Sequence, residues 1–170
     1  MKTKVLFKKD LENIVKGATF LASGGGGSYS VGMKLTEHFK KGYYPSDSFE
    51  LVRISELKPK TSGIVVAYIG SPESAKNFTV PDAAVSALET FKQETKKTID
   101  CIIPVEIGAL STTVACLVAA KMQLPVLDGE GAGRAVPTLN LISLSTGGIS
   151  VNPTIIAGPP SKDQNPYVSI

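Results

Sequence analysis

Residues 99–127 read I-D-C-I-I-P-V-E-I-G-A-L-S-T-T-V-A-C-L-V-A-A-K-M-Q-L-P-V-L, and this stretch decides the fold. The apolar run 99–105 is typical of a strand that is buried on both faces of a parallel sheet. Residues 112–122 are rich in small side chains and have the length of a helix, and 124–127 is a second short apolar run. The succession of buried strand, helix and buried strand predicts a parallel sheet with helical crossovers.

The flanking segments extend this pattern. The β-branched run 63–69 predicts another strand buried on both faces, and we expect short strands at 51–54 and 154–157. Apolar residues at helical spacing predict a helix over 11–21 with Asp10 as its cap and a second helix from Ser28 or Ser30 to Gly42. A third helix is predicted to start with a capping box formed by Thr79 and Asp82. We therefore predict one α/β domain over 1–160, with a Rossmann-like parallel or mostly parallel sheet flanked by helices, and a tail at 161–170.

Composition excludes several classes of protein. The chain has 170 residues, 42% of them hydrophobic, which is enough for a core. Its net charge of +3 comes from scattered lysines, which disfavours nucleic-acid binding, and no apolar run is long enough to span a bilayer. Cys101 and Cys116 lie in apolar surroundings, so we predict reduced, buried thiols and a cytoplasmic location. A single histidine, His38, excludes His-rich zinc sites and disfavours a Ser-His-Asp triad.

Unusual loops follow three of the predicted strands. These loops are 70–73, which contains Ser71, then 106–108 and 128–134. The carboxyl ends of parallel strands meet at one edge of a sheet, where ligands bind. We therefore expect the three loops to converge in space and to form a site for a small-molecule substrate.

The charged residues of the second half of the chain gather in these loops. Only seven charged residues lie between 101 and 170, and four of them are Glu106, Asp128, Glu130 and Arg134. One interpretation is an ion pair, such as Glu106 or Asp128 with Arg134, that locks the loops together. The other is a small-molecule site in which a carboxylate acts as general base and the arginine holds an anion or a carbonyl oxygen. The sequence requires no cofactor, although the three carboxylates leave a divalent metal as an option.

Four consecutive glycines, Gly24 to Gly27, stand in the stretch L-A-S-G-G-G-G-S-Y. They do not fit G-x-G-x-x-G in either register, and a Walker A motif would need a lysine where Met33 stands. Periodic helices on both sides also argue against a linker. Two interpretations remain: a tight turn at a helix N-terminus that offers N–H groups to an anion, carbonyl or imide edge, or a purely steric helix crossing.

Four motifs in this order, L-A-S-G-G-G-G-S-Y, Y-I-G-S-P-E, V-E-I-G and L-P-V-L-D-G-E-G-A-G-R-A-V-P, resemble the S-methyl thiohydantoin desulfurase family. The family is related by context to hydantoinases and oxoprolinases, and the resemblance covers roughly 11–141. It implies a Rossmann-like N-terminal domain followed by a β-rich domain. It also implies a hydrolysis in which water attacks the ring carbon bearing the methylthio group and expels methanethiol.

The resemblance implies roles for the residues singled out above. Asp128 or Glu106 would be the base and Arg134 would hold a ring oxygen, while Gly25, Gly26, Gly27, Ser71 and Glu130 would shape the substrate pocket. The chain departs from the family pattern at Ala109, Ser111, Glu130 and Ala132.

The chain ends near the point where the second domain would begin, so we expect that domain to be absent here. The alternative to a hydrolase is then a non-catalytic binding or assembly module, which needs a homo-oligomer or a partner subunit to supply the missing part.

Overall fold

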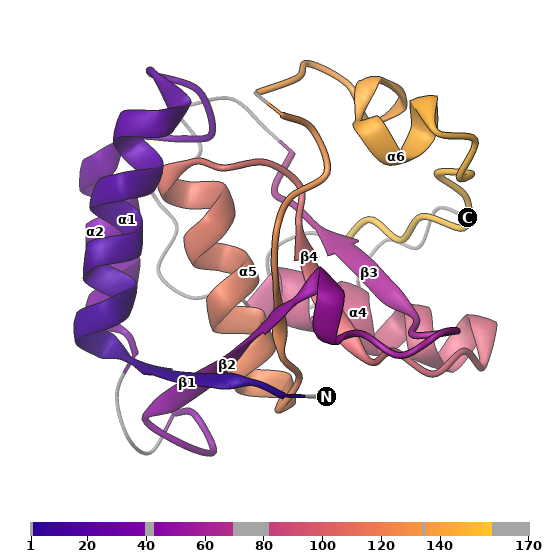
Figure 1. The fold of residues 1–170 in the computed structure, drawn as a ribbon, viewed down its shortest axis with the longest axis horizontal. Helices are drawn as coiled ribbons and strands as arrows, with labels where there is room; N and C mark the ends of the chain where they lie inside the picture. Colours follow the sequence, from indigo (N-terminus) through magenta and orange to yellow (C-terminus); the bar gives the residue numbers. More distant parts are fainter. Residues whose placement is uncertain (1, 40–42, 70–81, 134, 158–170) are drawn as a thin grey trace, which may run out of the picture.

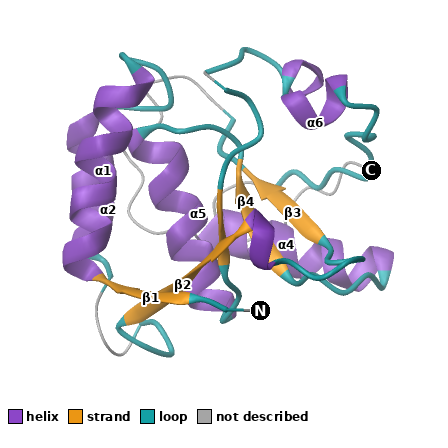
Figure 2. Cartoon of the chain, in the orientation of Figure 1, coloured by secondary structure: helices purple, strands orange, loops and turns teal. Residues whose placement is uncertain are grey.

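The computed structural model describes residues 2–39, 43–69, 82–133 and 135–157. Its five-stranded sheet has the order β1-β2-β5-β4-β3 (Figures 1 and 2). The strands are β1 (Lys4–Phe7), β2 (Ser48–Arg53), β3 (Gly63–Val66), β4 (Cys101–Pro104) and β5 (Val126–Asp128). All neighbouring pairs are parallel except β1 and β2, which are antiparallel. The predicted α/β fold with a mostly parallel sheet is confirmed, and its Rossmann-like character stays a prediction.

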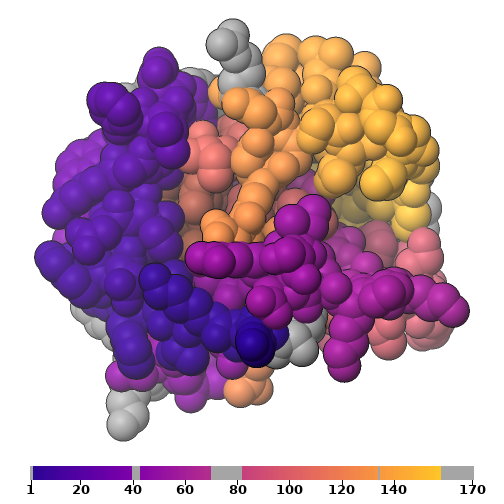
Figure 3. All heavy atoms as spheres, in the orientation of Figure 1, coloured from indigo at the N-terminus to yellow at the C-terminus, as the bar shows by residue number. Residues whose placement is uncertain are grey.

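Helices cover the sheet and connect its strands. The described α-helices are α1 (Lys8–Ala22), α2 (Tyr29–Glu37), α4 (Asp82–Thr95), α5 (Ala109–Met122) and the single turn α6 (Ser143–Thr146), with 3₁₀ turns at η1 (Ile54–Glu56) and η2 (Leu139–Leu141). None of the helices in the described ranges is both long and apolar enough to cross a membrane. In the space-filling view, the segment after β5 lies across the face between α1 and the C-terminal part of the described chain (Figure 3).

Helix α5 is the centre of the domain. It packs against β2 and β4 on one side and against α1 and α2 on the other, so nearly all its residues from Ala109 to Ala120 are buried. A helix that is enclosed in this way has no polar face, which explains its continuous run of Ala, Val, Leu, Thr and Cys. The predicted buried thiols are confirmed in the structure, because Cys101 and Cys116 are both free and buried.

Helix α1 starts earlier than predicted. Phe7 is its N-cap, and Asp10 stands three positions into the helix, where its carboxylate accepts the Phe7 N–H at 2.9 Å. Asp10 therefore occupies the third helical position and acts as the acidic member of a capping box, whose side chain accepts the N–H of the N-cap residue. It is not itself the N-cap residue. Leu11, Val15 and Ala18 are buried as expected, but Leu21 is 70% exposed because the core ends one turn before the helix does.

Several predicted elements differ from the structure, either in one boundary or because the element is not formed. Helix α2 starts after Ser28 as predicted but ends at Glu37, and β2 begins three residues before the predicted 51–54 strand. The segment 149–157 contains no strand. Strand β3 ends at Val66 and is an edge strand, so it is not buried on both faces, and Ile69 is 70% exposed. Strand β1 was not predicted; its pairing with β2 makes the sheet mixed.

Candidate functional site

The glycine turn between α1 and α2 closes over the N-terminus of α5. The carbonyl oxygen of Gly26 accepts hydrogen bonds from Leu110 N at 2.9 Å and from Ser111 N at 3.2 Å. These amides are among the four at a helix start that have no partner within the helix. The turn therefore caps α5 with its own backbone, and those two amides are not free to bind an anion.

Gly26 touches the backbone of Gly108, the N-cap residue of α5. Its φ is +64°, and a Cβ built on it would lie 2.5 Å from Gly108 Cα and 3.2 Å from Glu106 Oε1. Such separations leave no room for a side chain, and a positive φ favours glycine in any case. The steric interpretation of the glycine run thus describes what Gly26 does in the fold. On the other side of the turn, Ser28 caps α2 by accepting the Val31 N–H at 3.4 Å.

Glu106 lies beside this turn, at the carboxyl end of β4. Its side chain is half-buried, and each carboxylate oxygen has a donor: Ser111 Oγ donates to Oε1 at 2.9 Å, and Val136 N donates to Oε2 at 3.3 Å. The donors come from the first turn of α5 and from the segment after β5. Glu106 is therefore held in one orientation by two separate parts of the chain.

The loop after β5 is organised by Glu130. Its carboxylate accepts the N–H of Ala132 at 2.7 Å and the N–H of Gly133 at 2.6 Å. Gly131 N donates to the carbonyl oxygens of Pro104 and Val105, both at 3.1 Å, which ties the loop to the end of β4. Hydrogen bonds to a carboxylate are stronger than neutral ones. Glu130 thus fixes the shape of its own loop.

The structure brings together part of the predicted site. Gly26 and Glu106 adjoin each other, and Gly25 faces Ala135, whose neighbour Val136 donates to Glu106. Two of the three predicted loops therefore meet, together with the glycine turn. Asp128 is exposed and pairs through its backbone with β2, and its carboxylate makes no hydrogen bond or ion pair with any described residue. Ser71 and Arg134 lie outside the described residues, and so does any ion pair that Arg134 would make.

Ser111 and Val136 were not identified from the sequence as partners of Glu106. Ser111 stands five residues after Glu106, in the first helical turn, where a hydroxyl can reach back to the preceding loop. That position was a detectable signal. Val136 contributes only its backbone N–H, so its side chain carries no sequence signal for this contact.

The described part of the chain contains no cluster of side chains suited to bind a metal ion. No group of three or more His, Cys, Asp or Glu side chains there is placed to hold a metal ion. Glu130, one of the three carboxylates considered above, instead directs its oxygens to backbone amides of its own loop.

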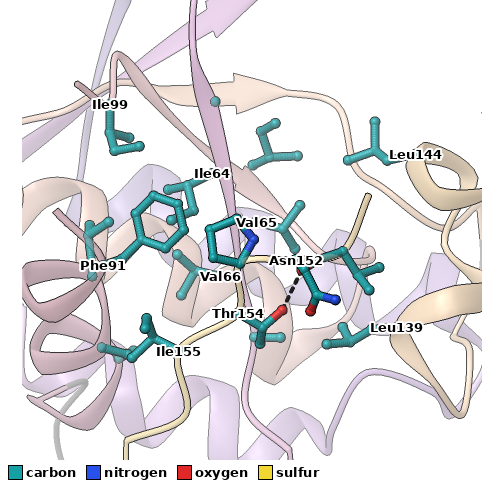
Figure 4. A pocket seen from close by; sticks show the side chains of 18 of the residues that line it. Ile64, Val65, Val66, Phe91, Ile99, Leu139, Leu144, Asn152, Thr154 and Ile155 are labelled. Atoms are coloured by element: carbon teal, nitrogen blue, oxygen red, sulfur yellow. Dashed lines mark hydrogen bonds between the residues drawn. The ribbon is translucent and has the colours of Figure 1, made fainter. Parts of the chain in front are cut away.

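Two cavities in the described part lie away from these residues. One, of about 600 Å³, is bounded by β3, α4 and the segment 149–157 (Figure 4). The other, of about 330 Å³, lies between β1, β2 and α1. Neither is lined by the glycine turn, Glu106, Asp128 or Glu130. The candidate site is thus a junction of loops rather than either of these cavities.

The chain matches a known protein family over most of its length. A family described as "S-Me-THD-like, N-terminal domain" matches residues 9–164. The chain belongs to the S-Me-THD-like N-terminal domain family. The family resemblance carried by the sequence motifs is confirmed.

One solved relative of this S-Me-THD-like domain is a protein from Chromobacterium violaceum, determined by X-ray crystallography in a structural genomics programme. It is 31% identical, with a TM-score of 0.80, over 96% of this chain and 46% of its own. The S-Me-THD-like domain thus spans under half of that relative. No curated protein in the comparison matched the chain.

Proposed function

We propose that this S-Me-THD-like domain carries the reacting groups for hydrolysis of a cyclic amide, such as an S-methyl thiohydantoin or a hydantoin. For an S-methyl thiohydantoin, water would add to the ring carbon that bears the methylthio group, and the carbon–sulfur bond would then break. The products are a hydantoin and methanethiol. The observation that carries the proposal is the oriented Glu106 carboxylate beside the Gly26 turn, in a domain of this family.

Glu106 is the general base in this proposal. Its Oε1 and Oε2 each accept one hydrogen bond, and a carboxylate oxygen has a second lone pair with which to take a proton. The carboxylate would remove a proton from water as it attacks, and it would return that proton to the departing methanethiolate. A base held at a fixed position needs no reorientation during the reaction.

The other predicted residues complete the site in the proposal. Charge develops on the ring as water adds, and Arg134 is the group proposed to hold the ring oxygen that receives it. The backbone on both sides of Arg134 is anchored, by Glu130 to Gly133 N and by Glu106 to Val136 N. Gly25, Gly26, Gly27 and Ser71 would shape the ring pocket, with Glu130 holding the loop shape.

Asp128 is the second candidate base. It stands at the end of β5, exposed, and its carboxylate has no hydrogen-bond partner among the described residues, so that carboxylate is free to contact a ligand. It lacks the orienting donors that Glu106 has. We therefore rank it second.

A binding or assembly module is the second candidate function. It is favoured by one observation: neither described cavity is lined by the candidate residues. In that case, the loops would need a partner domain or subunit to enclose a ligand.

The test is release of methanethiol from S-methyl thiohydantoins by the 170-residue chain, measured with a thiol reagent. We expect release by the wild type and a loss of at least roughly 100-fold in Glu106→Gln, the size typical of removing a general base. Asp128→Asn should retain most of the activity. Equal rates for the wild type and Glu106→Gln would reject Glu106 as the base, and no release above the background of the variants would favour the module.

A further inference from the structure

The larger cavity opens along the edge strand β3, and we call it the β3 groove. It is lined by β3 and the residues beside it, by α4, and by the segment 149–157. Figure 4 shows Ile64, Phe91 and Ile155 around it, with Thr154 donating a hydrogen bond from its hydroxyl to the Val151 carbonyl oxygen. Its volume, about 600 Å³, is large for a space left within one domain.

The described lining of the groove is mostly apolar. Among the described residues that line it, Lys97 is the one charged residue. Ile69, Ile149 and Ile156 lie at its rim and are 70%, 59% and 51% exposed. Large apolar patches on the surface of a soluble domain mark sites where another surface binds.

Strand β3 adds an unpaired edge to this apolar surface. It is the last strand of the sheet, and within the described residues no strand pairs with its outer side. Its sequence T-S-G-I-V-V-A-Y-I, over 61–69, contains none of the charges or prolines that blunt exposed edges. Native proteins typically cover an edge of this kind.

The comparison with the relative indicates what covers it. The S-Me-THD-like domain accounts for 46% of the Chromobacterium violaceum chain, and the matching family is defined as an N-terminal domain. The described part of the chain ends with the segment 149–157, which itself lines the groove. The groove is therefore close, along the chain, to residue 164, where the family match ends.

We propose that the β3 groove is the docking surface for the part of the longer relatives that follows the S-Me-THD-like domain. That part would present a complementary apolar face, which buries Ile149 and Ile156 against it. The proposal concerns assembly alone, and it does not depend on the hydrolysis proposed above.

The test is a binding titration without substrate. The part of the Chromobacterium violaceum protein that lies after its matched region is produced separately, checked for folding by circular dichroism, and titrated with the 170-residue chain. We expect a 1:1 complex that Ile149→Glu and Ile156→Glu each weaken at least roughly tenfold, as for anchors at an interface. Val5→Glu, on the opposite edge strand and with a similar exposed fraction of 49%, is the matched control and should bind like the wild type.

Absence of binding by the folded partner, or equal binding by all variants, would overturn the proposal. The proposal would also be overturned if the 170-residue chain associated with itself and Ile149→Glu or Ile156→Glu removed that association, because the occupant of the groove would then be a second copy of the chain. If the separate part does not fold, hydrogen exchange on the intact relative replaces the titration. Glutamates at its positions matching 149 and 156 should then speed exchange in its β3, and unchanged exchange would overturn the proposal.

Discussion

Gly26 and Gly108 are in backbone contact, so that a Cβ on Gly26 would lie 2.5 Å from Gly108 Cα. The two residues are 82 positions apart in the sequence, and their contact joins the glycine turn to the N-cap of α5. Through this contact, the α5 N-terminus receives its cap and Glu106 lies beside the turn.

Replacing Gly26 by alanine should therefore destabilise the domain. The added methyl group would meet Gly108 and would also force a positive φ on a residue with a side chain, so we expect a loss of about 2 kcal/mol or more. The control is Gly17→Ala, in α1, where a Cβ meets nothing and alanine should add about 0.5–1 kcal/mol. Urea unfolding measures both. Equal stabilities for the two variants would contradict the close contact.

Glu130 should matter for the order of its loop. Glu130→Ala removes the acceptor for Ala132 N and Gly133 N, so those two amides should exchange with solvent at least roughly tenfold faster. Asp128→Ala is the control, because the exposed carboxylate of Asp128 accepts no hydrogen bond from a described residue. Hydrogen exchange followed by NMR is the measurement. Unchanged exchange in Glu130→Ala would mean that the loop keeps its shape without the carboxylate.

Two adjacent tyrosines should respond in opposite ways to loss of the hydroxyl. The Tyr44 hydroxyl is buried and has no hydrogen-bond partner among the described residues, whereas the Tyr43 hydroxyl donates to the Asp82 carboxylate. Tyr44→Phe should leave stability unchanged or raise it by about 1 kcal/mol, while Tyr43→Phe should lower it by about 1 kcal/mol. Thermal unfolding compares the two variants. A clear loss in Tyr44→Phe would reveal a partner for that hydroxyl.

Stability should fall at alkaline pH. Burial raises the pKa of the Cys116 thiol to about 12. Burial, and to a smaller extent the nearby Asp82 carboxylate, also raises the pKa of Tyr68 to about 12. In the unfolded chain such groups ionise at pH of about 8.5 to 10. Above that range the unfolded state binds fewer protons than the folded state, so the free energy of unfolding decreases as pH rises from about 9 to 12.

Urea unfolding between pH 7 and pH 11 measures this dependence. Burial also raises the pKa of Tyr44, so Tyr44→Phe should show a smaller alkaline loss than the wild type. A free energy of unfolding that stays constant up to pH 11 would contradict the burial of these groups.

The centre of the fold could be predicted from the sequence because its signals are local. Residues 99–127 carry an unbroken apolar pattern, and β4, α5 and β5 lie within it. Strand β1 could not be predicted in the same way, since Leu6 is its one buried residue and its strand geometry depends on pairing with β2. Strand β3 has the same apolar composition as a central strand, so the sequence alone does not distinguish an edge position.

The candidate site was predictable to the extent that strand ends determine it. The rule that ligands bind at the carboxyl edge of a parallel sheet places Glu106 and the 128–134 loop together, and Gly131 does join them. The orientation of Glu106 was predictable only in part, because the position of Ser111 is a sequence signal but the backbone amide of Val136 is not. The hydrogen bonds from the amides of its own loop to Glu130 were not predictable either, because they depend on local backbone geometry.

The central claim is that the ring binds where the Gly26 turn meets Glu106. The most direct measurement is an NMR titration of the ¹⁵N-labelled 170-residue chain with a hydantoin, the product of the proposed reaction. We predict that the amide signals of Gly25 to Gly27 and Val136 shift in the wild type, and that these shifts are lost in Glu106→Gln. Shifts confined to the β3 groove, or shifts at Gly25 to Gly27 that persist unchanged in Glu106→Gln, would contradict the claim.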